Sequence, residues 1–481
     1  MNFRYSILSN KEREKILNSL LSEKNIAIDF SLTDFEINKI SKFQKPYISL
    51  GYALQYLFLK NRDILIVNSY DLIPEKIIDH VADQLNCNSK RLNKYWNIKN
   101  TKSKHTQDII KGLGYKKFEL NSDIEIILYN ITLSFGSKFD MMKKLIEELH
   151  LKKVVLPTIS TLEEVISKAI MSTDNIIYKQ IYNQIENKDK LEDLLTSEKN
   201  GISSFSRIKN TSVNISSNGV KELLKLIKEI NDYEKTIDLS FLSDNKISYF
   251  NTQIQQSHKM RIERFKDEYK KYSYLAMFLY FKKKEFMDMV IEVTLNHIHM
   301  IQKRSKKKTQ EYNAKNQVMY KSDRERFKEV VKDLLGISDF NEFMEYQNTD
   351  LMIIDKELSS HEYDLDEVDF LLKSYQSIDY INELLEVIEF DSNTKPKLVK
   401  FLKSYRHNKT RKNNKIDISF FDQKWQKNIK KYDYSKKVIG MTVMHTIRDS
   451  IRSGDLFVRD SKKYNSFDHY LISPVEYMSD T

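Results

Sequence analysis

Residues 80–95 of the chain read HVADQLNCNSKRLNKY. Apolar side chains recur three or four positions apart on each side of Asn86, and this spacing predicts two short helices joined at that residue. The apolar positions are Val81 and Leu85 before the turn and Leu92 and Tyr95 after it. Asparagine tolerates the left-handed backbone that a tight turn needs. The stretch therefore has the spacing of a helix-turn-helix, a motif whose second helix lies in the major groove of DNA.

The predicted second helix, from Ser89 to Tyr95, carries polar side chains on its outer face. They are Lys90, Arg91, Asn93 and Lys94. Residues of these types pair with phosphate oxygens and with the edges of guanine or adenine. We expect Arg91 and Asn93 to read bases and Lys94 to bind phosphate. The alternative is a helical hairpin with a solvated basic face.

A second polar strip follows at residues 96–105, which read WNIKNTKSKH. Its lysines, which suit phosphate contacts, are Lys99, Lys102 and Lys104. His105 has three interpretations: a base contact, a helix cap or an ordinary surface histidine. After this strip the pattern predicts an amphipathic helix that ends at Gly112.

The composition favours a helical protein of several domains. The chain of 481 residues exceeds the size of one hydrophobic core. Glycine (9) and proline (5) are scarce and apolar residues recur mostly at the helical period, which predicts a mainly α fold. The single cysteine excludes an intramolecular disulfide and argues against a cysteine-ligated zinc site. We find no signal peptide and no apolar run long enough for a bilayer, so we expect a cytoplasmic protein without a membrane partner.

Charge is distributed unevenly along the chain. Lys and Arg outnumber Asp and Glu by 79 to 68, which gives a net charge of +11. Residues 339–391 hold 16 acidic residues against Lys356 and Lys373, so this segment carries −14 and the rest of the chain carries +25. Segregation of this kind predicts basic surfaces for a polyanion and a separate acidic face, which is either solvated or docks a partner.

Changes in composition and periodicity predict five segments. They are an N-terminal helical DNA-binding module (1–72), the helix-turn-helix module (73–156), a helical module with a Ser/Asn-rich loop at 196–219 (157–255), a long-helix and acidic dimerisation or linker region (256–391), and a basic strip with a C-terminal block (392–481). Within the first segment, Ser9 and Glu12 have the spacing of a capping box that opens a helix.

Three further basic segments could contact DNA. The loop 196–219 is either a linker or a binding loop, and its candidates are Arg207 and Lys209. A long helix predicted from residue 256 ends in the run 303–308, which is either a solvated terminus or a phosphate contact. Residues 405–412 predict an exposed basic loop or tether, with candidates Arg406, Lys409, Arg411 and Lys412.

Motifs for several kinds of catalysis are missing from the sequence. The chain has no glycine-rich phosphate loop, no nucleophile elbow, no paired zinc-type histidines and no EF-hand loop. No spacing of Asp and Glu nominates a two-metal carboxylate site. The residues by themselves therefore indicate a helical, partly basic protein with a helix-turn-helix.

The block near the C-terminus has a more distinctive sequence than the helical segments before it. Residues 447–458 read IRDSIRSGDLFV, and with Ser461, Tyr464, Phe467, Tyr470, Leu471 and Pro474 they resemble a signature of the Tn-three-type transposases of replicative class II bacterial transposons. The N-terminal stretches RYSILS (4–9) and ISLGYALQ (48–55) are similar to that family as well. The helix-turn-helix residues, Lys104-His105 and Gly114-Tyr115 follow in the family's order.

The resemblance implies that this part of the chain binds the terminal inverted repeats of a transposon through several helical modules. It also implies helical dimerisation and linker segments, and then an RNase H-like domain whose Asp, Asp and Glu bind two magnesium ions. The chain stops at Thr481, where the family continues, so we carry over no catalytic acid and expect no cofactor in this chain. We expect binding of double-stranded DNA without cleavage, and pairing with a second copy or with full-length transposase. Arg452, in the block, is either a DNA contact or part of an ion pair, and Phe457 and Tyr464 are either core or functional residues.

Three alternatives stay open at this point. The chain could be a truncated inhibitor of transposition, a helical scaffold whose acidic segment docks a basic partner, or an inactive remnant. Sequence-specific DNA binding distinguishes the truncated inhibitor from the scaffold, because a scaffold should associate with any duplex weakly and in a salt-sensitive way.

Overall fold

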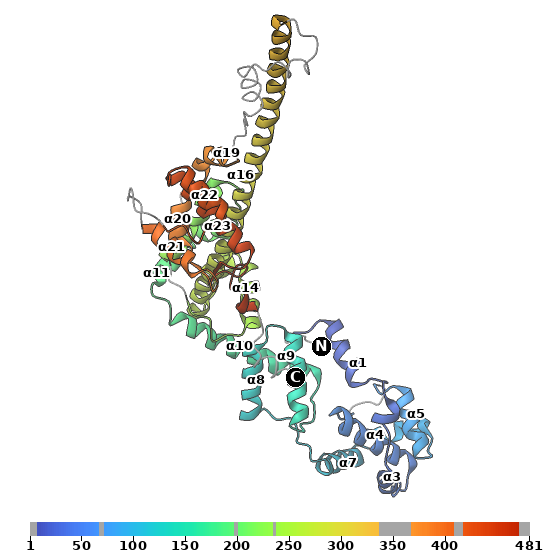
Figure 1. Ribbon diagram of the computed structural model, residues 1–481. Coiled ribbons are helices and arrows are strands. Elements are labelled where there is room, and N and C mark those ends of the chain that lie inside the picture. The colour runs from blue at the N-terminus through green and yellow to red at the C-terminus, as the bar shows by residue number, and fades with distance from the viewer. Residues whose placement is uncertain are drawn as a thin grey trace. The chain divides into compact units, whose positions relative to one another are not determined.

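The computed structural model describes residues 7–66, 72–196, 201–233, 237–335, 367–407 and 417–470. Most of these residues are helical (Figure 1). The sheet among them consists of two short strands. The predicted mainly α fold is therefore confirmed. The chain forms two compact units: Met1–Lys188 with Ile237–Phe278, and Asp189–Thr236 with Leu279–Thr481.

The first core of unit 1 surrounds a central helix, α4 (Pro46–Arg62). Proline at the first helical position presets the backbone for helix and needs no N–H partner there. Residues of α4 are buried on nearly all sides, because neighbouring helices cover it. These are α2 (Ile26–Asp29), α3 (Asp34–Ile40), α5 (Glu75–Gln84), the 3-10 helix η1 (Ser89–Arg91), α6 (Asn93–Trp96) and α7 (Lys99–Gly112). This core continues across the predicted boundary at residue 72.

The second core of unit 1 lies among α1 (Asn10–Leu20), α8 (Ser122–Ser134), α9 (Lys138–Leu151) and α10 (Ile159–Tyr182). The predicted capping box at the start of α1 is confirmed. The Ser9 side chain accepts the N–H of Glu12 at 3.3 Å, and the Glu12 carboxylate accepts the N–H of Ser9 at 2.8 Å. Both otherwise unpaired N–H groups at the helix start are thus satisfied.

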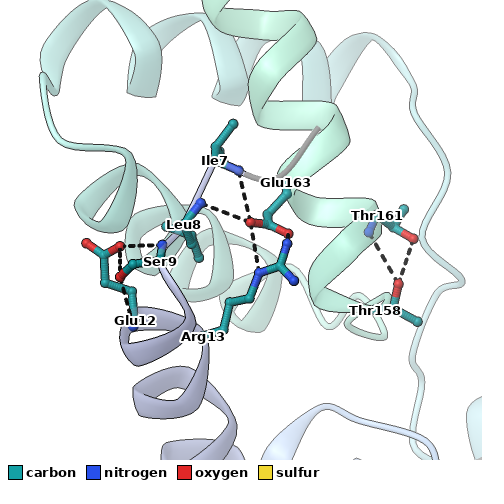
Figure 2. Close-up of polar contacts among 8 residues, drawn as sticks. All are labelled: Ile7, Leu8, Ser9, Glu12, Arg13, Thr158, Thr161 and Glu163. Atoms are coloured by element: carbon teal, nitrogen blue, oxygen red, sulfur yellow. Dashed lines mark hydrogen bonds and ion pairs between the residues drawn. The ribbon is translucent and has the colours of Figure 1, made fainter. Parts of the chain in front are cut away.

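A buried carboxylate joins the start of the chain to α10. Glu163 is 1% exposed and accepts the backbone N–H groups of Ile7 and Leu8 at 3.1 and 3.0 Å (Figure 2). It also forms an ion pair with Arg13, on the next turn of α1. All of these donors converge on one side chain, so α1 is fixed against α10.

The remainder of unit 1 consists of α14 (Asp244–Gln255), α15 (Lys259–Glu263) and the start of α16 (Glu268–Leu335). Lys246, on α14, is fully buried, and its Nζ lies 2.7 Å from Oδ1 of Asp174 on α10. A buried lysine needs such a partner, because an unpaired charge in the interior is strongly unfavourable.

Unit 2 contains the rest of α16 and a set of shorter helices. They are α11 (Lys188–Asp193), α12 (Ser204–Lys209), α13 (Ser217–Tyr233), α19 (Glu367–Lys373), η2 (Tyr375–Ile378), α20 (Ile381–Val387), α21 (Pro396–His407), α22 (Gln423–Lys431), α23 (Lys436–Arg452) and η3 (Phe467–Tyr470). Strands β1 (Phe390–Asp391) and β2 (Phe457–Val458) pair antiparallel, with Phe390 opposite Val458. The central helix is α23, whose residues 438–445 are all buried.

Two sequence predictions for unit 2 need correction. The predicted long helix does not end near residue 308, because α16 continues to Leu335 and the basic run 303–308 lies inside it. The predicted Ser/Asn-rich loop contains α12, which Ser203 caps and whose Phe205 and Ile208 are buried. Two apolar side chains in a polar stretch were enough to anchor a short helix.

None of the described helices combines the length and the apolar character needed to cross a membrane.

Candidate nucleic-acid interface

The turn after α5 has the predicted left-handed residue. Asn86 has a φ of 48°, and the N–H of Cys87 donates to the carbonyl of Ala82 at 3.0 Å. This bond closes the end of α5 and reverses the chain, as in other helix ends that use a left-handed residue. The predicted turn at Asn86 is confirmed.

The segment after the turn is not the single helix predicted from Ser89 to Tyr95. It is the three-residue 3-10 helix η1 followed by the four-residue helix α6. The side chain of Asn88 accepts the N–H of Lys90 at 2.8 Å and so caps the start of η1. The predicted apolar contacts are confirmed nevertheless, since Leu92 and Tyr95 are buried.

The helix that follows, α7, begins at Lys99 and therefore includes most of the strip predicted to precede it. Its inner face packs against α4. Gln55 of α4 is fully buried, donates to Oη of Tyr95 at 3.2 Å and accepts from Oγ1 of Thr106 at 2.9 Å. One glutamine thus connects α4, α6 and α7, which fixes the three elements relative to one another.

His105 lies on this inner face and is half-buried, so it is not the ordinary surface histidine that was one of the three sequence interpretations. Its Nδ1 is 3.2 Å from Oη of Tyr95, and its ring lies 4.8 Å from that of Phe43 and 5.1 Å from that of Tyr52. Burial lowers the pKa of His105 below its usual range, although the nearby carboxylate of Asp108 opposes this shift. The histidine is therefore part of an aromatic cluster that supports α7.

The other predicted DNA contacts around the turn, which are five cations and the neutral Asn93, lie on the surface. The exposed residues are Lys90, Arg91, Asn93, Lys94, Lys99 and Lys104. Within the described ranges, none of their side chains has an ion-pair partner. Lys102 differs, because it is half-buried and its Nζ donates to the carbonyl of Trp96 at 3.3 Å. The segment from α5 to α7, residues 75–112, which we call the turn module, thus presents unneutralised positive charge to solvent.

The predicted contacts in residues 196–219 are not free cations. Both Nη atoms of Arg207 bind the carboxylate of Glu229 on α13. The side chain of Lys209 is half-buried, and burial followed by repulsion from Lys282 lowers its pKa. Arg207 therefore serves the packing of α12 on α13, and its charge is already balanced.

The predicted basic loop near residue 408 is only partly within the described residues. Arg406 belongs to α21, while Lys409, Arg411 and Lys412 lie outside the described ranges. Beyond them, α22 and the start of α23 expose several lysines of the same predicted strip. They are Lys424, Lys427, Lys430, Lys431, Lys436 and Lys437.

The C-terminal block forms a turn that ends α23. Gly454 has a φ of 76°, a conformation that favours glycine, and the N–H of Leu456 donates to the carbonyl of Ser450 at 3.0 Å. Arg452 is exposed and has no ion pair in the part of the chain that the structure describes. Phe457 is buried in β2, whereas Tyr464 is half-buried. The backbone conformation of this turn therefore explains why position 454 is a glycine.

Asp455 ties this turn to the start of α21. Its carboxylate accepts bonds from Ser453 at 2.7 Å and from Thr394 at 2.9 Å, and it pairs with Lys395 at 3.0 Å. The hydrogen bonds from Ser453, Lys395 and Thr394 lower the pKa of Asp455 to about 2. The most specific residues of the sequence resemblance therefore hold the fold together here.

Sequence reasoning missed part of the polar surface of the turn module. Asn100, Gln107 and Lys111 are exposed along α7 together with Ser103 and Lys104. Their spacing of three or four residues is visible in the sequence, but the sequence prediction places residues 96–105 before the helix and therefore does not group these side chains on one helical face. Among the described residues, no group of three or more His, Cys, Asp or Glu side chains is arranged to hold a metal ion.

Comparison with known proteins gives two findings. Residues 7–169 match the family described as "Domain of unknown function (DUF4158)". The match includes both cores of unit 1 and therefore the whole turn module.

Several transposases are similar to the chain. The transposase for transposon Tn1546 of Enterococcus faecium is 22% identical over an alignment of 476 residues, which covers 92% of this chain and 47% of the relative. The transposase for transposon Tn2501 of Escherichia coli is 21% identical over an alignment of 501 residues, which covers 98% of this chain and 50% of the relative. The transposase for transposon Tn21 of Escherichia coli is 24% identical over 203 residues, with 41% and 20% covered. The chain spans about half the length of the first two relatives. It thus carries a DUF4158 domain and is homologous, over most of its length, to Tn-three-type transposases.

Proposed function

We propose that the chain binds the terminal inverted repeats of a transposon and serves DNA transposition as the end-recognition part of a transposase. The observation that carries this proposal is the turn module, where exposed cations that form no ion pair with any described residue surround a helix-turn-helix-like reversal. Phosphate contacts from such cations supply most of the affinity for a duplex, and base contacts supply the specificity. The homology to transposases indicates which DNA the turn module would bind, namely the ends of a transposon.

The proposal assigns binding, and not strand cleavage, to these residues, and binding through lysine, arginine and amide side chains needs no metal ion.

Pairing with a second copy, or with full-length transposase, belongs to the same proposal, because the two ends of a transposon have to be brought together. Sedimentation of the chain with and without terminal DNA tests this pairing.

The test of the function is a gel-shift titration at near-physiological salt. The chain is titrated against a duplex from the end of its own element and against a scrambled duplex of the same composition. We expect a preference of at least tenfold for the end, or about 1.4 kcal/mol. Chelation of divalent ions should leave this preference unchanged, and incubation with Mg²⁺ should leave the duplex uncut.

Other outcomes would support other functions. Equal binding to both duplexes would show that the basic surface acts only on polyanions, and end recognition would be wrong. Failure to bind either duplex would favour the scaffold, whose partner would then be a protein. Inhibition of transposition by added chain, despite specific binding, would support the truncated inhibitor.

A further inference from the structure

Of the elements in the turn module, α7 has the dimensions of a helix that enters a DNA groove. It contains 14 residues and is therefore about 21 Å long, whereas α6 contains 4 residues and spans about 6 Å. A helix that lies in the major groove has to present side chains from more than one turn to the base edges. The stretch that the sequence nominated, η1 and α6, is too short to do so.

The outer face of α7 carries the side chains that such a helix needs. The exposed positions recur at intervals of three or four residues, with one adjacent pair, and therefore form one stripe along the helix: Asn100, Ser103 with Lys104, Gln107 and Lys111. Asparagine and glutamine can bond adenine with two hydrogen bonds, lysine bonds guanine, and serine bonds several bases. The stripe contains no aliphatic or aromatic residue, so no protein neighbour is needed to cover it.

The inner face of α7 holds the stripe rigidly. Ile109 and Ile110 are buried against the α4 core, and Gln55 binds Thr106 from α4. Asp108, the acidic residue of α7, lies at the edge of the stripe, where its Oδ2 accepts from Oη of Tyr52 at 2.9 Å. Rigid support of this kind is what base recognition requires, because a reader has to be held close to its productive geometry.

The residues before α7 are placed differently. Arg91 and Asn93 are exposed, but they flank Leu92, whose buried side chain anchors the connection to the core. With Lys94 and Lys99 they form a basic approach to the first turn of α7. Cations next to a groove-binding helix fit contacts to the phosphate backbone, which position the protein without reading sequence.

We propose that α7 is the recognition helix, that Asn100 and Gln107 read bases, and that Arg91 with its neighbouring cations holds phosphates. This inference rests on the proposed function, since it specifies how the same site recognises a transposon end. It reverses the roles that the sequence assigned to residues 89–95 and to α7.

The experiment is selection of binding sites from a library of randomised DNA duplexes, using the full chain. One variant carries Asn100→Ala and Gln107→Ala, and a second carries Arg91→Ala and Asn93→Ala. The matched control carries Asn130→Ala and Gln180→Ala, which remove the same residue types from exposed positions on α8 and α10. Circular dichroism and melting temperature verify that each variant is folded.

We expect the wild type and the control to select the same motif. The Asn100/Gln107 variant should lose that motif at the base pairs it reads and bind the best wild-type duplex about tenfold or more weakly, with unchanged binding to a scrambled duplex. The Arg91/Asn93 variant should keep the motif and bind both duplexes more weakly by the same factor.

Two results would overturn the inference in distinguishable ways. If the wild type selects no motif, the proposed end recognition fails and the recognition helix fails with it. If the wild type selects a motif that the Asn100/Gln107 variant keeps at full affinity, or that only the Arg91/Asn93 variant loses, the function stands and α7 is not the reader.

Discussion

The guanidinium of Arg13 and the carboxylate of Glu163 form an ion pair across 150 residues of sequence, and the carboxylate is almost completely buried. The same carboxylate accepts the N–H groups of Ile7 and Leu8 (Figure 2). The pair therefore fixes the first helix of the chain on α10, and both residues lie within the segment that matches DUF4158.

Replacement of Glu163 should destabilise unit 1 strongly. Glu163→Ala leaves the guanidinium and two N–H groups without their acceptor, and we expect a loss of about 3 kcal/mol in the free energy of unfolding. Glu163→Gln keeps an acceptor oxygen and should lose about half as much. The control is Glu164→Gln, which removes an exposed pair with Lys168 and should lose about 0.3 kcal/mol. Urea unfolding measures all three, and equal losses at both positions would contradict the role of Glu163.

Two glycine substitutions should have opposite effects on the turn module. A Cβ at Gly51 would lie 2.2 Å from Cδ1 of Tyr95, so Gly51→Ala forces the ring of α6 away from α4 and should cost about 1–3 kcal/mol. Gly112 in α7 has no neighbouring atom within 4 Å of such a Cβ, and Gly112→Ala should stabilise the helix by about 0.5 kcal/mol. Thermal unfolding of the two variants measures this difference. Unchanged stability for Gly51→Ala would mean that Tyr95 does not pack as described.

Protonation of His445 should destabilise unit 2 in acid. The imidazole is buried in α23, 5.0 Å from the ring of Trp425, and its Nε2 has no hydrogen-bond partner among the described residues. Burial, with smaller effects of Arg448 and Lys424, lowers the pKa of His445 to about 3. The unfolded chain therefore binds this proton from about pH 6.5 downward while the folded chain does not, so stability should fall with pH by up to about 1.4 kcal/mol per unit until about pH 3.

A substitution of His445 distinguishes the effect of its protonation from the effects of other groups that are protonated in acid. His445→Met cannot be protonated and should lose less stability than the wild type between pH 6 and about pH 4. His299→Gln, at an exposed position on α16, is the control and should behave as the wild type. Unfolding in urea is followed by tryptophan fluorescence in a Trp96→Phe background, so that the remaining tryptophan, Trp425, reports on unit 2. Parallel pH profiles for wild type and His445→Met would contradict the prediction.

Lysines of the turn module should determine the salt dependence of DNA binding. Lys94→Ala and Lys99→Ala should each weaken binding to every duplex and reduce the slope of log K against log salt by about 0.9. Lys11→Ala and Lys152→Ala change exposed lysines outside the module and serve as controls for net charge. Gel shifts over a series of salt concentrations give the slopes. Equal slopes for module and control variants would place the phosphate contacts elsewhere.

Arg207 should contribute to stability and not to DNA binding. Its guanidinium is engaged with Glu229, so Arg207→Ala should leave the DNA affinity unchanged and lower the stability of unit 2 by about 1 kcal/mol. Glu229→Gln should show a similar loss, and the double variant should lose less than the sum of the two. A selective loss of DNA affinity in Arg207→Ala would instead restore the contact that the sequence suggested.

Local sequence signals predicted local structure well. The capping box of Ser9 and Glu12 and the left-handed turn at Asn86 depend on bonds within a few residues, and both are present. The spacing of Leu92 and Tyr95 predicted their burial, although the backbone between Ser89 and Trp96 is not one α-helix. Asn88 caps the start of the 3-10 helix by accepting the N–H of Lys90, and apolar periodicity does not distinguish a 3-10 turn from an α-helical one.

The roles of single polar residues were decided by tertiary structure. In the sequence, Arg207, His105 and Glu163 are ordinary surface types, and nothing near them along the chain marks their partners. The fold pairs Arg207 with Glu229, places His105 among aromatic rings, and buries Glu163 beneath the start of the chain. By itself, the sequence determined the helical fold and the turn, because these follow from neighbours a few residues apart, and it determined which cations the chain contains. Only the packing decided which of those charges stay exposed for a polyanion, because a charge is neutralised by groups that the folded chain brings within a few ångströms.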